Sequence, residues 1–328
     1  MQLILTQIEN KGAAYEIVDE FEREILRDYN VKCLYLQNKY IYKFLYSIYR
    51  FRKKFGISFY LHKRPKTPLS DKKHRFVVMM AWEPYKCLPF FVLSSHYKSI
   101  YLFDAWQHDH EDIKSSAVFY KIDYIFTSSS QAASLLRETV KDIRIKWIPE
   151  GITPNEYKFL PYDKKNIDVL SVGRKYNQHH EKIVKELEQL GLTYIYEKNK
   201  GQLIFPDRKD FINGLARSKI SICVPSSVTH PERAGNIETM TIRYLQSMVS
   251  KCLVLGHAPQ EMIDVFGYKP VIELDMKNPV SQISYLLDNF NSYVPLIEKN
   301  YKEVLNNHTW ENRWNTIKSI YTQQEQKK

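Results

Sequence analysis

The stretch Asp168-Val-Leu-Ser-Val-Gly173-Arg174-Lys175 decides the fold that we expect for this chain. Its apolar run is hydrophobic at successive positions, which is typical of a parallel strand buried on both faces. The run ends at a glycine, and residues 181–190 then place their apolar side chains at helical spacing. A strand, a glycine turn and a helix in this order predict the first half of a βαβ unit.

The same alternation extends outward over most of the chain. The short apolar runs, rich in Val, Ile, Phe or Tyr, are residues 76–81, 100–103, 124–127, 143–148, 168–172, 193–196, 220–224, 252–255 and 271–274. The further helical patterns are residues 207–217, 237–249 and 280–290. Strands that alternate with helices of this length predict an α/β protein with two Rossmann-like, doubly wound domains.

The boundary between these domains is expected within residues 151–167, where polar residues and prolines show no clear period. We therefore predict one domain over residues 1–160 and a second over residues 161–328. A last helix over residues 310–324 carries a stripe of large apolar side chains. That helix either closes the C-terminal domain or reaches back to the N-terminal one.

The composition limits the class of protein. The 328 residues carry a formal charge of +11, so nucleic acid, an anionic membrane surface and phosphorylated small molecules are candidate partners. The four cysteines form no CxxC pair and no zinc spacing. Cys223 and Cys252 lie in apolar runs and are expected to be buried, which fits a reducing compartment. With no signal-peptide pattern and no membrane-spanning run, we expect a cytoplasmic protein, soluble or peripheral on the inner face of the cell membrane.

Gly173, Arg174 and Lys175 are the first candidate site. They follow a strand and precede a helix, where ligands of parallel sheets usually bind. A glycine permits close approach of a phosphate, a helix N-terminus attracts an anion, and a guanidinium can grip a diphosphate. An ordinary turn with solvated basic residues explains the same pattern, and the residues alone leave both open.

Glu238 and Gln246 are the second candidate site. They lie on a polar loop and the helix that follows the strand at 220–224, and their spacing puts them on roughly the same helix face. Two polar side chains on an otherwise buried helix need partners, which a polyhydroxylated ligand would supply. Helix capping together with a surface-facing glutamine is the alternative.

Arg174, Glu238 and Gln246, followed by Cys252-Leu-Val-Leu-Gly256, resemble the GT-B glycosyltransferases of family 4, in particular the branch related to spore-maturation-type transferases. That family carries Gly-Arg after a strand and a Glu-x7-Glu motif before a strand of this type. The segment His308-Thr-Trp-Glu-Asn-Arg-Trp314 is similar to its closing signature. The resemblance covers roughly residues 165–320 and is weak in the N-terminal half.

The resemblance implies roles for single residues. Arg174 would neutralise the donor diphosphate and Glu238 would contact the donor sugar. Gln246 stands where the family has the glutamate that holds the ribose, and an amide lacks the charge of a carboxylate. The second basic position of the family falls on His179, for which Lys175 or Lys182 could substitute.

The loop segment with Arg233, Gly235, Asn236 and Ile237 would line the donor site in the same family, with backbone N–H groups near phosphate or sugar oxygens. The donor would be a UDP- or GDP-sugar acting as substrate, with no permanently bound cofactor. No Asp-x-Asp loop suited to Mg²⁺ or Mn²⁺ is found, so we expect no bound metal.

The implied activity is that of a hexosyl- or related transferase, with retention of the anomeric configuration. It would act on a glycan or lipid-linked acceptor in cell-surface polysaccharide or glycoconjugate synthesis. A nucleotide-sugar epimerase on the same fold is one alternative. The other is a non-catalytic, basic membrane- or nucleic-acid-binding protein that keeps the transferase fold, and the glutamine at position 246 favours it.

His108 and Asp109 are candidates on the acceptor side. They lie in a polar cluster directly after the strand at 100–103, where they could orient an acceptor hydroxyl or assist proton transfer. A solvated loop and a metal site are the alternatives. Ser128, Ser129 and Ser130 are expected to cap the next helix instead of supplying a nucleophile.

Residues 29–70 contain no Asp or Glu, and their Lys and Arg residues are interleaved with Tyr and Phe. Such a segment suits an anionic membrane surface, and membrane docking fits a lipid-linked acceptor. A basic helix pair with its aromatic residues in the core is an alternative. Stacking on single-stranded nucleic acid is the least favoured interpretation, and we do not expect nucleic acid as a partner.

Overall fold

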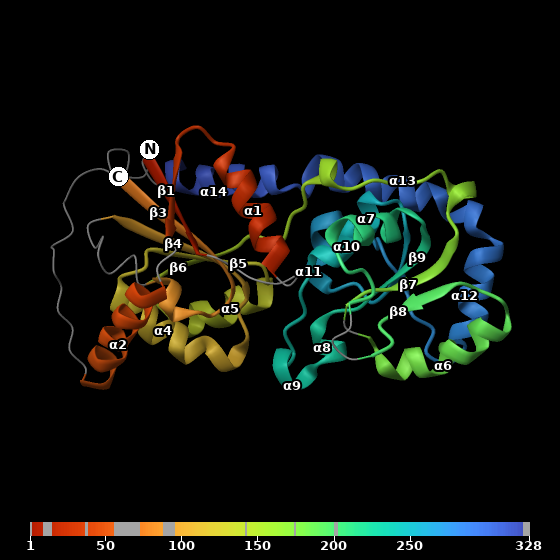
Figure 1. Ribbon diagram of the computed structural model, residues 1–328, viewed down its shortest axis with the longest axis horizontal. Helices are drawn as coiled ribbons and strands as arrows, with labels where there is room; N and C mark the ends of the chain where they lie inside the picture. Colours follow the sequence, from red (N-terminus) through yellow and green to blue (C-terminus); the bar gives the residue numbers. More distant parts are fainter. Residues whose placement is uncertain are drawn as a thin grey trace. The chain divides into compact units, whose positions relative to one another are not determined.

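The computed structural model describes residues 2–8, 15–36, 39–55, 73–87, 96–141, 143–173, 175–199 and 203–323. The chain divides into two compact units, which are described separately (Figure 1). Unit 1 comprises Met1–Glu150 together with Trp310–Lys328, and unit 2 comprises Gly151–Thr309. Residues 151–160 therefore belong to unit 2 and the last helix to unit 1, which differs from a simple division near residue 160.

Unit 1 contains a parallel sheet of six strands within the described residues, in the order β2-β1-β3-β4-β5-β6. The strands are β1 (Gln2–Ile8), β2 (Val31–Leu36), β3 (Lys73–Ala81), β4 (Tyr97–Asp104), β5 (Tyr124–Thr127) and β6 (Arg144–Trp147). The chain adds β2 on one side of β1 and β3 on the other. This reversal of direction is the mark of a doubly wound sheet.

The helices of unit 1 are α1 (Glu16–Leu26), α2 (Lys39–Phe55), α4 (His110–Tyr120), α5 (Ser130–Thr139) and α14 (Trp310–Gln323), with the short turns η3 (Pro84–Cys87) and η4 (Gln107–Asp109). Helices α1 and α14 cover one face of the sheet, where a single buried cluster joins them to the strands. Trp310 is fully buried there and stacks on Phe21 of α1, with ring centroids 4.4 Å apart. The apolar stripe of the last helix therefore reaches back to the N-terminal sheet.

Unit 2 contains a parallel sheet of five strands among the described residues, in the order β11-β10-β9-β7-β8. The strands are β7 (Ile167–Ser171), β8 (Tyr194–Tyr196), β9 (Ser218–Cys223), β10 (Leu253–Gly256) and β11 (Ile272–Glu273). Successive residues of β7 enter different buried clusters, Val169 one and Leu170 the other. The sheet is thus covered on both faces, as the apolar pattern predicted.

The helices of unit 2 are α6 (Asn177–Gln189), α7 (Arg208–Ala216), α8 (Ser226–Thr229), α9 (Pro231–Ala234), α10 (Ile242–Val249), α11 (Gln260–Phe266), α12 (Pro279–Asp288) and α13 (Phe290–Asn307), with the turns η5 (Pro154–Glu156) and η6 (Tyr162–Lys164). The predicted helix over residues 237–249 was wrong at its start, because α10 begins at Ile242. Glu238 therefore lies in the preceding loop, so the shared helix face proposed for Glu238 and Gln246 does not exist.

Two smaller expectations are confirmed. Ser129 is the N-cap of α5, and its side chain accepts a hydrogen bond from the backbone N–H of Ala132. Cys223 and Cys252 are buried in unit 2. Strands β1 and β2 were not predicted, since the apolar alternation was recognised only from residue 76 onward.

Candidate functional site

The carboxyl ends of β7 and β9 are the part of unit 2 where the topology of a doubly wound sheet favours a ligand. From β7 the chain passes through α6 to β8 on one side, and it then returns through α7 to β9 on the other side. The connections at the ends of β7 and β9 therefore separate, and such a switch point is where ligands of doubly wound sheets usually bind. Gly173 follows β7 with a φ of +87°, a conformation that side chains of L-residues rarely adopt.

Arg243 lies beside this glycine turn. A Cβ atom built on Gly173 would be 3.9 Å from a terminal nitrogen of the Arg243 guanidinium. The guanidinium also lies over the ring of Phe211 in α7, 4.7 Å from its centroid. A planar cation held on an aromatic ring next to a glycine turn is well suited to bind a phosphate.

Polar atoms without hydrogen-bond partners gather after β9. The atoms are Ser227 Oγ, Thr229 Oγ1 and His230 Nδ1, and each is buried without a partner among the described residues. They come from α8 and the residue after it, which follow the end of β9. Buried polar atoms are nearly always satisfied in folded proteins, so a polar ligand would complete this part of the site.

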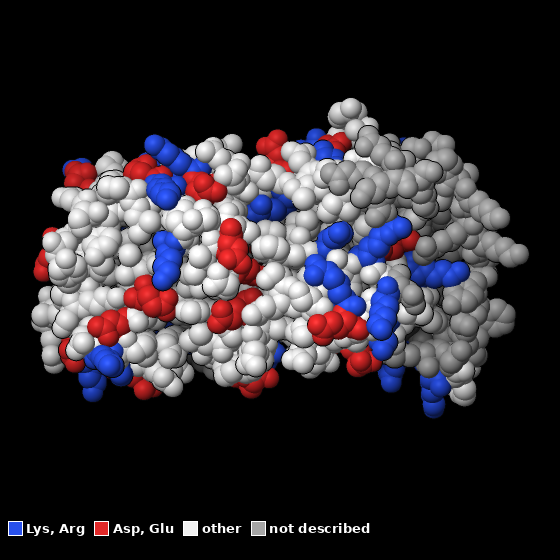
Figure 2. Space-filling model, turned by 180° about the vertical axis from the view of Figure 1, so that it is seen from behind, with Lys and Arg blue, Asp and Glu red and all other residues white. Residues whose placement is uncertain are grey.

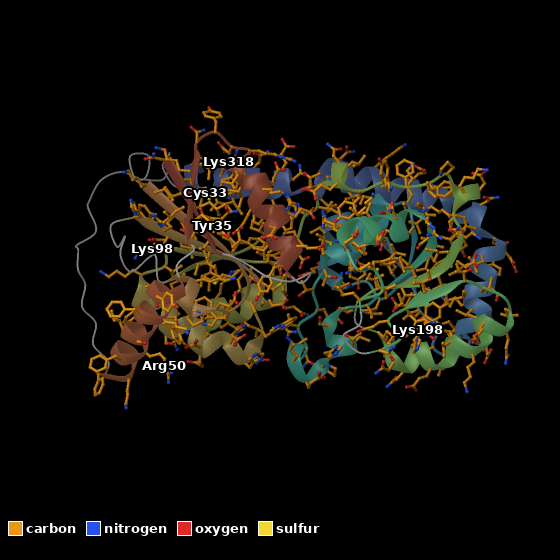
Figure 3. The ribbon with its side chains drawn as sticks, in the orientation of Figure 1. Cys33, Tyr35, Arg50, Lys98, Lys198 and Lys318 are labelled. Atoms are coloured by element: carbon orange, nitrogen blue, oxygen red, sulfur yellow. The ribbon has the colours of Figure 1, made fainter. Side chains whose placement is uncertain are left out.

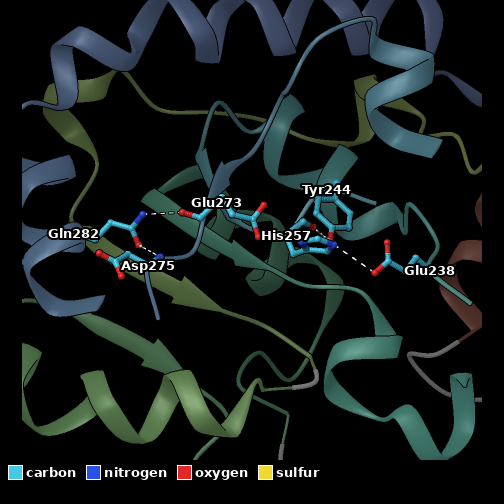
Figure 4. Close-up of polar contacts among 6 residues, drawn as sticks. All are labelled: Glu238, Tyr244, His257, Glu273, Asp275 and Gln282. Atoms are coloured by element: carbon cyan, nitrogen blue, oxygen red, sulfur yellow. Dashed lines mark hydrogen bonds and ion pairs between the residues drawn. The ribbon is translucent and has the colours of Figure 1, made fainter. Parts of the chain in front are cut away.

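Glu238 is held at the end of β10. One of its carboxylate oxygens is 3.4 Å from Nε2 of His257, and Nδ1 of the same ring is 2.9 Å from a carboxylate oxygen of Glu273 (Figure 4). Partial burial lowers the pKa of His257, but the hydrogen bond to Glu273 and the charges of both carboxylates outweigh it and raise that pKa. His257 and Glu273 are therefore linked to a predicted site residue, although neither was predicted.

Gln246 lies away from this carboxylate. It is 6% exposed, and its amide donates a hydrogen bond of 2.9 Å to the hydroxyl oxygen of Tyr157. Its carbonyl oxygen is buried without a partner among the described residues. Nearby, Tyr157 and Arg208 help to line a hollow of about 560 Å³, together with Asn155, Glu156, Lys158, Lys209, Ile212 and Asn213.

His179 carries no charge that could neutralise a phosphate at neutral pH. It is 1% exposed in α6, and burial, followed by the charges of His180 and Lys182, lowers its pKa to about 4. Lys175 donates to the backbone oxygen of Glu197 at 2.6 Å, which fixes it beside the glycine turn. Lys182 donates to the backbone oxygen of Met276 at 2.7 Å.

The loop predicted to line the site contains the short helix α9. The backbone N–H groups of Arg233, Gly235 and Ile237 all donate hydrogen bonds within the loop itself. Arg233 and Asn236 are exposed, whereas Ile237 is 3% exposed and packs inward. These three N–H groups, which were predicted to lie near phosphate or sugar oxygens, are therefore already hydrogen-bonded within the loop. Arg174 lies outside the described residues.

The predicted acceptor-side residues lie in unit 1, in the turn η4 after β4. His108 Nε2 is 3.4 Å from an Asp109 carboxylate oxygen, and the side chains are 61% and 26% exposed. The next histidine, His110, is buried at the start of α4 and contacts the backbone oxygen of Ala105. His108 is thus exposed and Asp109 is half-buried beside it, at the carboxyl edge of the first sheet.

Within the described part of the chain, no group of three or more His, Cys, Asp or Glu side chains is placed to hold a metal ion. None of its helices combines the length and apolar character that crossing a bilayer requires.

Comparison with known proteins places the fold. No protein-family model matches the chain, and no curated protein sequence matches it. Sucrose-phosphate synthase from Thermosynechococcus elongatus matches in structure over 100% of both chains, with 11% identity and a TM-score of 0.59. Anabaena HepE in complex with UDP-glucose matches over 98% of this chain and 100% of its own, with 10% identity and a TM-score of 0.59. The structure of HepE with UDP gives 9% identity and a TM-score of 0.57.

At these identities the likeness shows the fold alone. It confirms the predicted fold class, GT-B, with its two parallel, doubly wound sheets flanked by helices. The particular family 4 branch receives no support from these matches.

Proposed function

We propose that this chain is a glycosyltransferase that takes a sugar from a nucleotide-sugar donor bound at the carboxyl edge of the unit 2 sheet. The observation that carries the proposal is the placement of Arg243 beside the Gly173 turn at the switch point of that sheet. A diphosphate site requires a turn whose backbone can come close to the phosphate, a helix N-terminus, here that of α6, and a fixed guanidinium. Anabaena HepE, which shares the fold, binds UDP-glucose, and this supports a UDP-sugar, with a GDP-sugar as the other donor class.

The sugar of the donor would extend toward Glu238. This carboxylate is held at the end of β10, the strand next to β9, where it can accept hydrogen bonds from sugar hydroxyls. Transfer then depends on positioning and on electrostatic stabilisation of the departing diphosphate by Arg243 and, as a further cation, Arg174. We propose that transfer proceeds with retention and without a bound metal.

The acceptor is proposed to be a glycan or a lipid-linked glycan used in cell-surface polysaccharide or glycoconjugate synthesis. His108 and Asp109 in unit 1 are the residues that we propose to orient its hydroxyl group, because they are adjacent and solvent-accessible at a sheet edge. Exposed polar side chains of this kind can approach a large acceptor without rearrangement of the core.

Helix α2 supports docking on an anionic membrane at the inner face of the cell membrane. Tyr40, Phe44, Phe51 and Phe55 follow helical spacing along one face of α2 and are 83%, 66%, 58% and 57% exposed. These four side chains are therefore not in the core, which was the alternative interpretation of the segment; residues 37–38 and 56–70 of the segment lie outside the described residues. Arg50 projects outward from the same helix, which is typical of a helix at a lipid interface (Figure 3).

The charge on unit 1 also favours an anionic surface. In Figure 2, Lys and Arg side chains gather on the right of the view, over unit 1, whereas Asp and Glu are more frequent over unit 2.

Sedimentation with vesicles tests the docking: binding is expected with phosphatidylglycerol and not with phosphatidylcholine alone. Phe44→Ser with Phe51→Ser should abolish it, and equal binding by the double variant would contradict it.

Calorimetry with UDP-glucose, UDP and GDP tests the proposed function. A nucleotide is expected to bind, with UDP-glucose tighter than UDP because only the sugar reaches Glu238. Glu238→Ala should remove this difference and leave UDP bound, and Glu188→Ala on the exposed side of α6 serves as the matched control. The proposal fails if no nucleotide binds to the folded protein. Formation of an epimeric nucleotide sugar without any acceptor would replace transfer by epimerisation.

A further inference from the structure

His257 lies between two carboxylates in unit 2 and is the central residue of Figure 4. Nδ1 is 2.9 Å from Glu273, which is 66% exposed, and Nε2 is 3.4 Å from Glu238, which is 30% exposed. The histidine side chain itself is 36% exposed. One ring therefore joins the exposed edge strand β11 to the loop that carries the proposed sugar-binding carboxylate.

The number of protons on this ring decides whether both contacts are made. Ionised carboxylates only accept hydrogen bonds, and a neutral imidazole has a single N–H to donate. A neutral His257 can serve one of Glu238 and Glu273, whereas the imidazolium ion serves both. The raised pKa of His257 agrees with this geometry.

The backbone around the ring is fixed from several sides. The Tyr244 hydroxyl donates to the backbone oxygen of His257 at 2.6 Å, and the His257 N–H donates to the backbone oxygen of Cys223 at 3.1 Å. The amide of Gln282 donates to the backbone oxygen of Glu273 at 2.7 Å. The backbones of His257 and Glu273 thus have defined positions, and the ring reaches both carboxylates from a fixed point.

We propose that His257 is a positioning residue, whose imidazolium form holds Glu238 in place for the donor sugar while Glu273 holds the imidazolium. The inference rests on the proposed function, in which Glu238 contacts that sugar. When the proton leaves, the ring keeps at most one carboxylate, and Glu238 loses a charged partner. Affinity for a nucleotide sugar is then highest at pH values below the pKa of His257 and falls as the pH rises through it.

The other titratable groups around the ring do not produce the same dependence. Glu238 and Glu273 are the carboxyl groups that face His257, and Tyr244 approaches it from α10. Burial, followed by the charges of Cys223, Glu238 and Glu273, raises the pKa of Tyr244 well above its usual value, so it stays neutral. UDP-glucose carries a diphosphate diester, which has no ionisation near neutral pH.

The experiment measures the dissociation constant of UDP-glucose by calorimetry between about pH 5.5 and 9. The affinity is expected to fall about tenfold across one inflection, the effect of losing one charge-assisted hydrogen bond. The Glu273→Gln variant should keep the affinity at the acidic end and move the inflection to lower pH, because the histidine loses its nearer carboxylate. The His257→Gln variant should show no inflection.

A titration of the His257 ring protons by NMR gives a readout independent of binding. Its midpoint should coincide with the inflection in the wild type and fall in Glu273→Gln. An inflection that is absent from the wild type, or unmoved in Glu273→Gln, while UDP-glucose still binds, overturns the positioning role and leaves the proposed function intact. If UDP-glucose and UDP do not bind at any pH, the proposed function fails and this inference fails with it.

Discussion

Replacement of Arg243 by methionine is the sharpest single change for the donor site. Methionine keeps an unbranched side chain, and it removes the charge, the hydrogen-bond donors and the cation–π contact that the guanidinium makes with Phe211. The guanidinium is 3.9 Å from the position of a Cβ on Gly173, within the space where a diphosphate would meet the turn. The variant therefore tests the electrostatic part of phosphate binding.

The expected loss follows from the strength of the contact. A hydrogen bond to a charged group contributes about 1.5–3 kcal/mol, which corresponds to roughly 10- to 150-fold weaker binding. Arg243→Lys keeps the charge but loses the planar fork, and an intermediate loss is expected. UDP binding is measured by calorimetry, after circular dichroism has shown that each variant is folded.

Arg217→Met is the matched control. Arg217 is an exposed residue at the C-terminal end of α7, where its Nε donates to Asn166 at 2.8 Å, and its loss changes the net charge by the same amount. We expect UDP affinity within about twofold of wild type, since surface charges removed from the ligand are largely screened. If Arg243→Met binds UDP as tightly as Arg217→Met does, Arg243 does not bind the phosphates.

Three predictions concern the folded state. Burial raises the pKa of Glu22 to about 8. The contribution of Glu22 to the free energy of unfolding therefore falls as the pH rises from about 4.5 to about 8. The Glu22→Gln variant should raise the melting temperature at alkaline pH and leave it nearly unchanged at acidic pH. Lys165 donates hydrogen bonds to three backbone oxygens at 2.9 to 3.0 Å. Lys165→Met should lower the free energy of unfolding in urea by at least about 3 kcal/mol. Lys164→Met, at the exposed neighbouring residue, should lower it by less than about 0.5 kcal/mol. A Cβ on Gly256 would lie 1.7 Å from the backbone oxygen of Cys223, so Gly256→Ala should separate β9 from β10 and lower the melting temperature by several degrees. An unchanged unfolding curve for Lys165→Met or Gly256→Ala, or for Glu22→Gln at alkaline pH, would contradict the packing that the prediction assumes.

Much of the fold could be predicted because burial on both faces leaves a direct signal in the sequence. Each predicted strand from residue 76 onward overlaps an observed one, since short runs rich in Val, Ile, Phe or Tyr favour strands. The edge strand β2 gives no such run, because Lys32, Cys33 and Tyr35 are exposed. The last helix could be recognised from its period, but a stripe of apolar residues does not say which sheet it will cover.

The candidate site was harder to predict, since its parts meet through the fold and not through spacing. Gly173 could be found because it lies just after a strand, and Glu238 because it fits the spacing of the motif that the sequence resembles. Arg243 is one basic residue in the first turn of a helix, and nothing in its neighbours says that it faces the glycine turn. His257 and Glu273 meet because β10 and β11 are paired, which no local pattern encodes.

A crystal structure with UDP-glucose is the measurement that bears most directly on the central claim, a donor site at the carboxyl edge of the unit 2 sheet. The expected result is density for the diphosphate within hydrogen-bond distance of Arg243 and the residue 173 turn, with the glucose directed toward Glu238. Density for the nucleotide at any other place in unit 2, or against unit 1 alone, would contradict it.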